Sequence, residues 1–246
     1  MSAAEDRPFA YAFAPSNCGG LRVEVAGAPV MLRPCGGLWL EVERTLVVSD
    51  LHLEKGSSYA RRGQMLPPYD TAETLNALEA EIAVLDPRTL IFLGDTFHDR
   101  FWEDRIAPGD AMRVRSLALG RHVIWVTGNH ERDSVKTLPG EMADELALAG
   151  LVLRHEPVAG PAFGEVAGHL HPCAIVAGKG RSVRRRCFVT DGERLILPAF
   201  GAYAGGLNVR DVAFAGMFAR PPLMGALGVG RVHPIGWRSL RGDQKS

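Results

Sequence analysis

Short apolar runs alternate with amphipathic stretches through the first half of the chain. Runs rich in Val, Ile and Leu at 45–49, 89–93 and 122–126 predict three buried strands. Apolar residues at helical spacing predict a helix over 71–85, and a second helix is expected at 108–119. Strands that alternate with helices indicate an α/β fold with a parallel sheet.

The segments around these helices contain capping and turn residues. Asp70, followed three residues later by Glu73, predicts a capping box at the start of the first helix. The stretch 54–69, with two glycines and a Pro-Pro pair, predicts a polar loop. Residues 139–149 predict one further helix.

The remaining apolar runs have the pattern of short strands. Residues 21–43 predict antiparallel strands with a turn at Gly36-Gly37, and Asp191-Gly192 predicts a second hairpin turn. The tail from residue 201 is rich in Gly and Pro and shows no pattern that assigns it. Later strands are expected at 151–153, 163–167, 187–190 and 194–197.

Length and composition fit a single large domain spanning residues 1–246, because α/β folds of ~200–250 residues often stay undivided. Apolar residues make up 46% of the chain, so a sizeable core is available. The four cysteines show no Cys-x-x-Cys pairing, which argues against a zinc ribbon or a disulfide scaffold and favours reduced thiols in a cytoplasmic protein. No apolar stretch has the length of a signal peptide or of a ~18-residue membrane span.

The formal net charge is zero, but the charges are unevenly distributed. Residues 179–246 hold twelve Lys and Arg residues and only four Asp and Glu residues. Such a basic segment is typical of a nucleic-acid-binding surface. A solvated basic face explains the same composition, so both interpretations stay open.

Polar segments with metal-ligand chemistry follow the predicted strands. In an open α/β sheet the carboxyl ends of the strands form the active site. Glycines at these positions let the backbone turn tightly, so that a carboxylate projects above the sheet. The candidate ligands are Asp50, His52, Asp95, Asn129, His155, His169 and His171.

This ligand set is large enough for two divalent cations. Asp50 and His52 point the same way from a strand end and can reach one ion, whereas a carboxylate such as that of Asp95 can bridge two. Mixed imidazole and carboxylate ligands suit Mn²⁺, Zn²⁺, Fe²⁺, Ni²⁺ or Co²⁺ better than Mg²⁺ or Ca²⁺, and Mn²⁺ is the first expectation. Two metals ~3.5–4 Å apart are a standard device for attacking a phosphate ester.

The order of the motifs resembles the calcineurin-like metallophosphoesterase superfamily, whose pattern is Asp-x-His, Gly-Asp, Gly-Asn-His-Asp/Glu, a lone His and Gly-His-x-His. The match runs from about residue 45 to His171. The resemblance implies a four-layer α/β/β/α sandwich of two mixed sheets flanked by helices. It also implies two ligand sets that share Asp95, namely Asp50, His52, Asp95 and His171 for one metal and Asp95, Asn129, His155 and His169 for the other.

The resemblance also implies catalytic roles. His130 faces the phosphate in the family and is proposed to stabilise the transition state or to protonate the leaving oxygen. Many family members orient this histidine with an Asp three residues after the Gly-Asp aspartate, but here that position is His98, with Asp99 next. The segment Gly-Asp-Thr-Phe-His is similar to the version in a class of DNA nucleases. Whether His98 or Asp99 supports His130 stays open.

Three longer stretches, at 50–70, 93–99 and 200–209, resemble a small bacterial subfamily of ligase-associated DNA damage response endonucleases. The resemblance implies a DNA substrate and work alongside a DNA ligase and a helicase. Nuclease relatives often form homodimers, so a homodimer is one expectation, although no part of the sequence identifies an interface.

Basic and aromatic side chains follow directly after the first two candidate ligands. Lys55, Tyr59, Arg61 and Arg62 are therefore expected at the rim of the site, with the cations on flanking phosphates and Tyr59 stacked on a base or sugar. A solvated surface loop is the alternative. The run 179–186 (KGRSVRRR) is either a phosphate-binding hairpin or only an exposed one.

Together these observations predict a binuclear-metal-dependent phosphodiesterase, in first place a DNA endonuclease, in which a hydroxide that bridges the metals attacks the phosphate. A phosphoesterase for small nucleotides or cyclic phosphodiesters is the alternative. A non-catalytic scaffold is a third hypothesis, but degenerate family members lose ligands or the Asn-His pair, and these residues are all present here.

Overall fold

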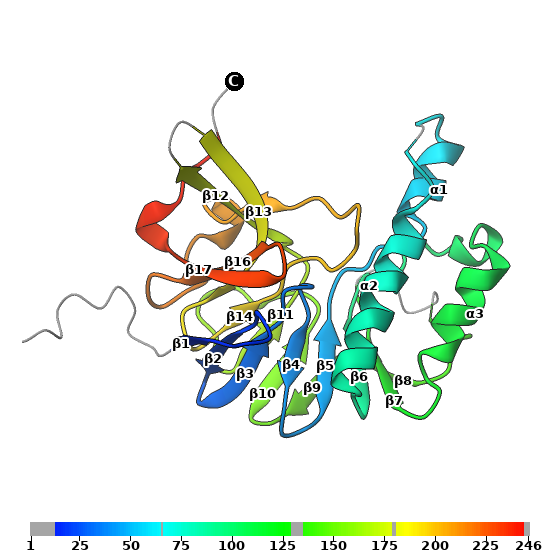
Figure 1. The fold of residues 1–246 in the computed structure, drawn as a ribbon, viewed down its shortest axis with the longest axis horizontal. Helices are drawn as coiled ribbons and strands as arrows, with labels where there is room; N and C mark the ends of the chain where they lie inside the picture. The colour runs from blue at the N-terminus through cyan, green and yellow to red at the C-terminus, as the bar shows by residue number, and fades with distance from the viewer. Residues whose placement is uncertain (1–12, 65, 129–134, 179–180, 244–246) are drawn as a thin grey trace, which may run out of the picture.

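Two mixed β-sheets packed face to face form the centre of the molecule (Figure 1). The structure, a computed structural model, describes residues 13–64, 66–128, 135–178 and 181–243. Within these residues the two sheets and the helices on one of them give the α/β sandwich that the sequence predicts.

The first sheet has the described strands β1 to β8 in sequential order. Neighbours from β1 to β5 are antiparallel, whereas those from β5 to β8 are parallel. The strands are β1 (Phe13–Pro15), β2 (Leu21–Val25), β3 (Ala28–Leu32), β4 (Leu38–Leu40), β5 (Thr45–Val48), β6 (Thr89–Leu93), β7 (His122–Val126) and β8 (Glu141–Ala143).

The second sheet has the order β15-β12-β13-β14-β11-β10-β9, and β16 joins β13 while β17 joins β16. The pairs β10–β11, β11–β14 and β12–β15 are parallel, and the other pairs are antiparallel. The strands are β9 (Glu145–Leu148), β10 (Leu151–Arg154), β11 (Glu165–Ala167), β12 (Pro172–Gly178), β13 (Arg181–Thr190), β14 (Leu195–Ile196), β15 (Leu207–Asn208), β16 (Leu223–Gly228) and β17 (Arg231–Gly236).

The longer helices cover the outer face of the first sheet (Figure 1). Helix α2 connects β5 to β6 and helix α3 connects β6 to β7, as the crossovers of parallel strands require. The described helices are α1 (Lys55–Arg61), α2 (Asp70–Leu85) and α3 (Pro108–Ser116), with the short 3₁₀ helices η1 (Trp102–Asp104), η2 (Val212–Phe214) and η3 (Trp237–Ser239).

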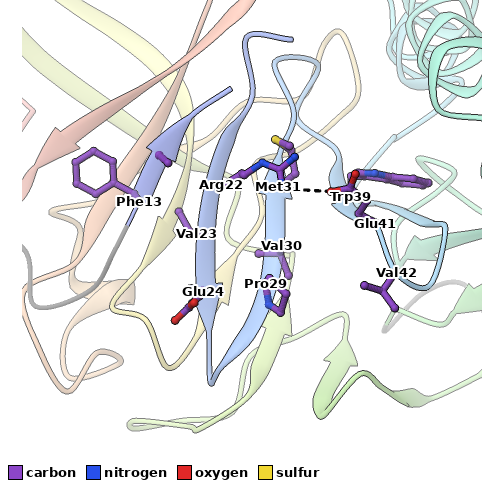
Figure 2. A pocket seen from close by; sticks show the side chains of 11 residues that line it. Phe13, Arg22, Val23, Glu24, Pro29, Val30, Met31, Trp39, Glu41 and Val42 are labelled. Carbon is purple, nitrogen blue, oxygen red and sulfur yellow. Dashed lines mark ion pairs between the residues drawn. The ribbon is translucent and has the colours of Figure 1, made fainter. Parts of the chain in front are cut away.

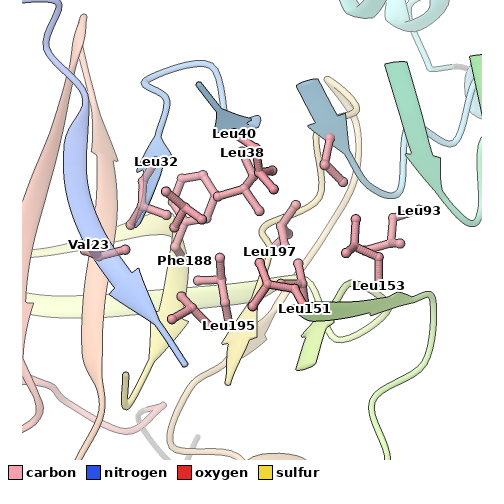
Figure 3. Close-up of a cluster of buried hydrophobic side chains, with 14 of the residues drawn as sticks. Val23, Leu32, Leu38, Leu40, Leu93, Leu151, Leu153, Phe188, Leu195 and Leu197 are labelled. Carbon is pink, nitrogen blue, oxygen red and sulfur yellow. The ribbon is translucent and has the colours of Figure 1, made fainter. Parts of the chain in front are cut away.

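The largest apolar core lies between the sheets (Figure 3). Leu38 of the first sheet and Phe188 of the second are both fully buried in it, and burial of such a side chain contributes about 1.5–3 kcal/mol. Leu93 and Leu153 also pack in this core. Each of these leucines is the last apolar residue of its run and is followed by polar residues. Packing of the leucines in the core therefore fixes the positions of the polar residues that follow.

Two further clusters complete the packing. One joins α2 and α3 to the outer face of the first sheet, with Leu78 and Val114 from the helices against Phe92 of β6. The other packs Phe214 and Leu240 of the C-terminal segment on the outer face of the second sheet. The tail that showed no sequence pattern therefore adds the strands β15, β16 and β17 to this sheet and packs 3₁₀ segments on its outer face.

Most predicted strands are confirmed, with ends that shift by a few residues. The turn at Gly36 is confirmed and has a φ of 99°, and the hairpin at Asp191-Gly192 joins β13 to β14. The helix predicted at 108–119 is confirmed as α3, which ends at Ser116.

The helix predicted at 139–149 is wrong, because this stretch forms β8 and β9. Gly140 has a φ of 132°, which is not helical, and its missing Cβ would lie 2.7 Å from Trp125 Nε1. Leu146 and Leu148 pack against the core between the sheets with the period of two that a strand requires. In the sequence, the apolar residues of this stretch fit both the alternation of a strand and the spacing of a helix.

Two predictions around 54–70 are also wrong. The predicted loop contains helix α1, and Asp70 is the first residue of α2 rather than its cap. No side chain caps α2, and Asp70 Oδ2 instead accepts a hydrogen bond from the Gly56 N–H at 2.8 Å. The carboxylate that looked like a local cap is therefore a tertiary contact that holds the start of α1.

A groove of about 440 Å³ lies on the outer face of β1 to β4 (Figure 2). Phe13, Met31, Trp39 and Val42 line it, and an ion pair between Arg22 and Glu41 crosses its rim. None of the described candidate ligands lies in this groove.

The described cysteines are free thiols, in agreement with the sequence prediction. Among the described residues, the helices lack the combination of length and apolarity that crossing a bilayer demands.

Removal of the buried ion pair between Arg194 and Glu165 tests how much this pair stabilises the packing of the second sheet. The two side chains are 1% and 3% exposed, and Arg194 Nε lies 2.7 Å from Glu165 Oε2. Because Glu165→Ala leaves a buried guanidinium without its main partner, we expect a loss of about 3–5 kcal/mol in the free energy of unfolding, measured by urea denaturation. The matched control Glu193→Ala breaks the exposed pair with Arg220 and should cost less than about 1 kcal/mol. Equal losses in the two variants would contradict this account.

Candidate metal centre

The candidate ligands stand at the ends of strands from both sheets. Asp50 follows β5 and Asp95 follows β6, and these strands are parallel neighbours. The pairing continues beyond the strands, because the N–H of Asp50 donates to the Gly94 carbonyl and the N–H of His52 donates to the Asp95 carbonyl. His155 follows β10, and His169 follows β11, which is its parallel neighbour. The two parallel strand pairs, β5–β6 and β10–β11, therefore bring the candidate ligands at their carboxyl ends together.

Asp50, His52 and His171 form a first group of possible ligands. His171 Nε2 lies 3.1 Å from Asp50 Oδ1 and 3.2 Å from His52 Nε2. Ligand atoms at about 2.0–2.2 Å from a common ion are expected at such mutual distances. These three side chains, from two sheets, therefore present their ligand atoms to one point.

Asp95, His155 and His169 form a second group. His155 Nε2 lies 3.2 Å from His169 Nδ1 and 3.7 Å from Asp95 Oδ1. The other oxygen of Asp95 faces the first group, since Oδ2 lies 4.0 Å from His52 Nε2. Asp95 thus offers one carboxylate oxygen to each group, which is the arrangement that a bridging ligand requires.

The backbone is strained at five of these residues. Asp50, His52, Asp95, His169 and His171 have φ values of 45–67°, in the left-handed region that residues with a side chain rarely adopt. Such strain is maintained only when surrounding contacts fix it, and it concentrates at functional sites. The strain observed here marks these strand ends as a functional site.

Glycines next to the ligands leave room for the neighbouring side chains. A Cβ on Gly94 would lie 2.1 Å from His155 Nδ1, and a Cβ on Gly168 would lie 1.8 Å from Ser49 Oγ. A Cβ on Gly128 would lie 2.8 Å from Asp95 Oδ1. The glycines of the Gly-Asp, Gly-Asn and Gly-His motifs are therefore required by close packing of the two ligand groups.

Hydrogen bonds orient the ligands for a cation. The His155 Nδ1–H faces the Leu93 carbonyl at 3.0 Å, so Nε2 is left with the lone pair that a metal needs. Asp50 Oδ2 accepts hydrogen bonds from Ser49 Oγ at 2.5 Å and from the His169 N–H at 2.9 Å. Asp50 Oδ1 is fully buried and accepts no hydrogen bond from the part of the chain that the structure describes. A cation between Oδ1 and the facing His171 Nε2 would satisfy this atom, so the residues fit a metal.

The protonation states suit metal binding. Burial, opposed by nearby carboxylates, lowers the pKa of His52 to about 4, so its imidazole is neutral at pH 7. Burial alone would raise the pKa of Asp50, but the close approach of His171, with smaller effects of His155 and Ser49, holds it below its ordinary value. A neutral imidazole and an ionised carboxylate are the forms that bind cations.

His98 lies at the rim of the first group. Its ring centroid is 6.2 Å from that of His52 and 5.7 Å from that of Tyr59. Burial and the nearby charge of Lys55 lower the pKa of His98, which favours a neutral ring. The structure therefore brings His98 next to a ligand and to the predicted substrate-binding residues.

Asp99 is bound to other parts of the protein. Its Oδ2 accepts a hydrogen bond from Arg105 at 2.9 Å, and its Oδ1 accepts one from the Phe101 N–H. Burial alone would raise the pKa of Asp99, but these bonds and one from Ser58 of α1 hold it below its ordinary value. Asp99 thus helps to hold α1. Asn129 and His130 lie outside the described residues, so the choice of His98 or Asp99 as the partner of His130 stays a prediction.

Helix α1 carries the predicted substrate-binding residues and begins three positions after His52. Lys55 Nζ lies 5.9 Å from the Tyr59 ring centroid, and Arg61 and Arg62 are exposed at the end of the helix. Figure 1 shows α1 projecting beyond the sheets on the same side as the hairpin of β12 and β13.

A polar network below α1 fixes its place. Glu54 accepts hydrogen bonds from Ser57 at 2.6 Å and from Thr71 of α2 at 2.9 Å, and Arg105 donates to Ser57 at 3.0 Å. Sequence reasoning missed Ser49, Glu54 and Arg105, because each acts through a partner that only the fold brings close. The one local signal was the position of Ser49 directly before Asp50.

The described part of the basic run 179–186, residues 181–186, lies on strand β13, and most of its arginines with described side chains are engaged. Arg184 pairs with Asp243 at 2.8 Å, and Arg186 donates to main-chain carbonyls. Arg185 is exposed and bonds to the carbonyl of its neighbour Arg184. Lys179 and the side chain of Arg181 lie outside the described part of the chain.

Comparisons with known proteins agree with this centre. The family model described as "Calcineurin-like phosphoesterase" matches residues 43–199. Nuclease MPE of Pseudomonas putida has 29% sequence identity and a TM-score of 0.66, and the match covers 88% of this chain and 100% of that chain. No curated protein matches the sequence.

Two solved structures match less closely. One is AQ665 of Aquifex aeolicus, a protein of unknown function, with 22% identity, a TM-score of 0.38 and coverage of 52% of this chain and 78% of that chain. The other is the E. coli phosphoesterase Yfce, with 15% identity, a TM-score of 0.38 and coverage of 78% of this chain and 98% of that chain.

Substitution of Gly94 tests whether close packing sets the ligand geometry. In Gly94→Ala the new methyl group must displace His155, so we expect the Mn²⁺ affinity to fall by about 10- to 100-fold in calorimetric titration. Gly120→Ala is a matched control, because Gly120 has a φ of 72°, close to the 74° of Gly94, but open space around it. Both variants should lose about 1–2 kcal/mol of stability from backbone strain. Unchanged metal affinity in Gly94→Ala would refute the packing argument.

Proposed function

This chain belongs to the calcineurin-like phosphoesterase family, and on that premise we propose that it is a binuclear-metal-dependent phosphodiesterase that cleaves DNA. It is a metal-dependent phosphoesterase by family membership. The observation that carries the proposal is the double orientation of Asp95: one oxygen faces His52 at 4.0 Å and the other faces His155 at 3.7 Å.

The two groups would divide the ligands between two cations. Asp50, His52 and His171 would hold one, and His155 and His169, with Asn129, would hold the other, with Asp95 shared. When bound, two such cations make a nucleophile available from water at neutral pH and offset the charge that develops on the phosphate oxygens. Four imidazoles with two carboxylates favour Mn²⁺, and then Zn²⁺, Fe²⁺, Ni²⁺ or Co²⁺, over Mg²⁺.

The chain's own groups then act on the substrate. Lys55 would attract a phosphate beside the scissile bond, because it begins α1 close to His52, and Arg61 and Arg62 at the other end of the helix would attract phosphates farther along the strand. Tyr59 offers a ring for a base, and His98 beside it extends the aromatic surface toward the metal centre. His130 would donate a proton to the leaving oxygen.

DNA as the substrate is supported by the printed name of the 29% identical structure, a nuclease, which this chain matches over 88% of its length. The sequence stretches shared with ligase-associated endonucleases point the same way. On this basis we place the protein in DNA repair with a DNA ligase and a helicase. The free cysteines agree with a cytoplasmic location, and a homodimer is the assembly that nuclease relatives suggest.

Loss of the shared ligand tests the reaction. We expect Asp95→Ala to reduce kcat/KM on bis(p-nitrophenyl) phosphate by roughly 10³-fold or more, because several kcal/mol of charge stabilisation depend on both cations. Removal of metal by a chelator should have the same effect on the wild-type protein, and Mn²⁺ should restore only the wild type. Asp110→Ala, which breaks a remote ion pair with Arg113, should keep full activity. Full turnover by folded Asp95→Ala would refute the proposal.

Side-by-side assays test the substrate. We expect Mn²⁺-dependent cleavage of a DNA oligonucleotide to exceed that of 2′,3′-cyclic nucleotides and p-nitrophenyl phosphate. Tyr59→Ala should lower kcat/KM on the oligonucleotide by about tenfold, since stacking contributes ~1–3 kcal/mol per base, and should not affect bis(p-nitrophenyl) phosphate. Tyr69→Ala, at an exposed tyrosine outside α1, is the control. If the protein cleaves the cyclic nucleotide faster than the oligonucleotide, its proposed substrate would be a small phosphodiester and not DNA.

A further inference from the structure

Arg186 of β13 is a half-buried cation, and its hydrogen bonds to described residues all go to main-chain carbonyls. Its Nη1 lies 2.9 Å from the Ala199 oxygen, 3.2 Å from the Phe200 oxygen and 2.9 Å from the Gly201 oxygen. Among the described residues, no carboxylate forms an ion pair with it. The place of its guanidinium is therefore set by these carbonyls and not by a counter-ion.

The other side of the same segment contacts the loop that carries Asp50. The Phe200 N–H donates to the Ser49 carbonyl at 2.8 Å, and the Gly201 N–H donates to the Asp50 carbonyl at 3.2 Å. Gly201 is pressed so closely onto this loop that a Cβ there would lie 2.0 Å from the Leu51 oxygen. Residues 199–201 are therefore held between the Arg186 cation and the backbone of residues 49–51.

The continuation of this segment contacts the third ligand of the first group. A Cβ on Gly206 would lie 2.3 Å from the His171 carbonyl oxygen, and the Leu207 N–H donates to that oxygen at 3.1 Å. Arg186 itself is paired in register with Cys173, two residues after His171. The segment 199–207 thus touches the backbone on both sides of the first ligand group.

We propose that Arg186 is a positioning residue for the first metal site. By holding the carbonyls of 199–201, it presses the segment 199–207 against the loops of Asp50 and His171, whose left-handed backbones need outside contacts to persist. Arginine suits this task because its charge strengthens each bond and its rigid planar guanidinium fixes Nη1, the one nitrogen that donates to all three carbonyls. The inference rests on the metal centre of the proposed function and not on DNA as the substrate.

The test is metal affinity, measured one site at a time by calorimetric titration of metal-free protein with Mn²⁺. A His155→Ala background removes a ligand of the second group, and a His52→Ala background removes one of the first. We expect Arg186→Met to weaken binding about 10- to 100-fold in the His155→Ala background and to leave binding in the His52→Ala background within about twofold. Arg185→Met, at the exposed neighbour of Arg186 on the same strand, should change neither.

Arg186→Lys is a second variant that tests the inference if Arg186→Met fails to fold. It retains the charge and a nitrogen donor but loses the rigid planar guanidinium that fixes Nη1 on the three carbonyls, so we expect a loss of first-site affinity smaller than that of Arg186→Met. A purely structural role would lower the melting temperature and leave both Mn²⁺ affinities unchanged, and that result in either folded variant would overturn the inference. Wild-type protein that binds two Mn²⁺ ions but does not cleave DNA would refute the substrate proposal and leave this one standing.

Discussion

The carboxylate of Asp95 stands where four strand ends from two sheets meet, and the geometry of the centre depends on that convergence. Strands β5 and β6 bring Asp50, His52 and Asp95 to one edge, and β10 and β11 bring three histidines to the same edge from the opposite sheet. The apolar core between the sheets sets the distance between these edges. Because each ligand group takes residues from both sheets, a change in that packing would move the ligands within each group apart.

Bringing these ligands together requires strained backbone conformations. Five ligand residues adopt left-handed conformations, and each places a side chain where an extended strand could not. Tight glycine contacts, the His155 bond to the Leu93 carbonyl and the segment 199–207 are the contacts that hold this strain. Contacts outside the centre therefore fix the positions of the ligand residues. Bound cations would then add attraction between ligand groups that the fold has already aligned.

The elements that the sequence predicted correctly and the candidate ligands that the structure brings together share one property: their signal is local. Asp50, His52 and Asp95 directly follow apolar runs that can only be buried strands, and glycines mark the turns beside them. The failures concern tertiary contacts. Asp70 has the spacing of a cap but bonds to Gly56, and residues 139–149 have helical composition but alternate as strands. Arg186 belonged to a run that suggested phosphate binding, and only the fold reveals that its partners are the carbonyls of 199–201.

The measurement that tests the central claim most directly is anomalous X-ray diffraction from crystals of the protein loaded with Mn²⁺. The account predicts two anomalous peaks ~3.5–4 Å apart, one beside Asp50, His52 and His171, the other beside His155 and His169, with Asp95 between them. A single peak in fully loaded crystals, or two peaks that do not share Asp95, would contradict it.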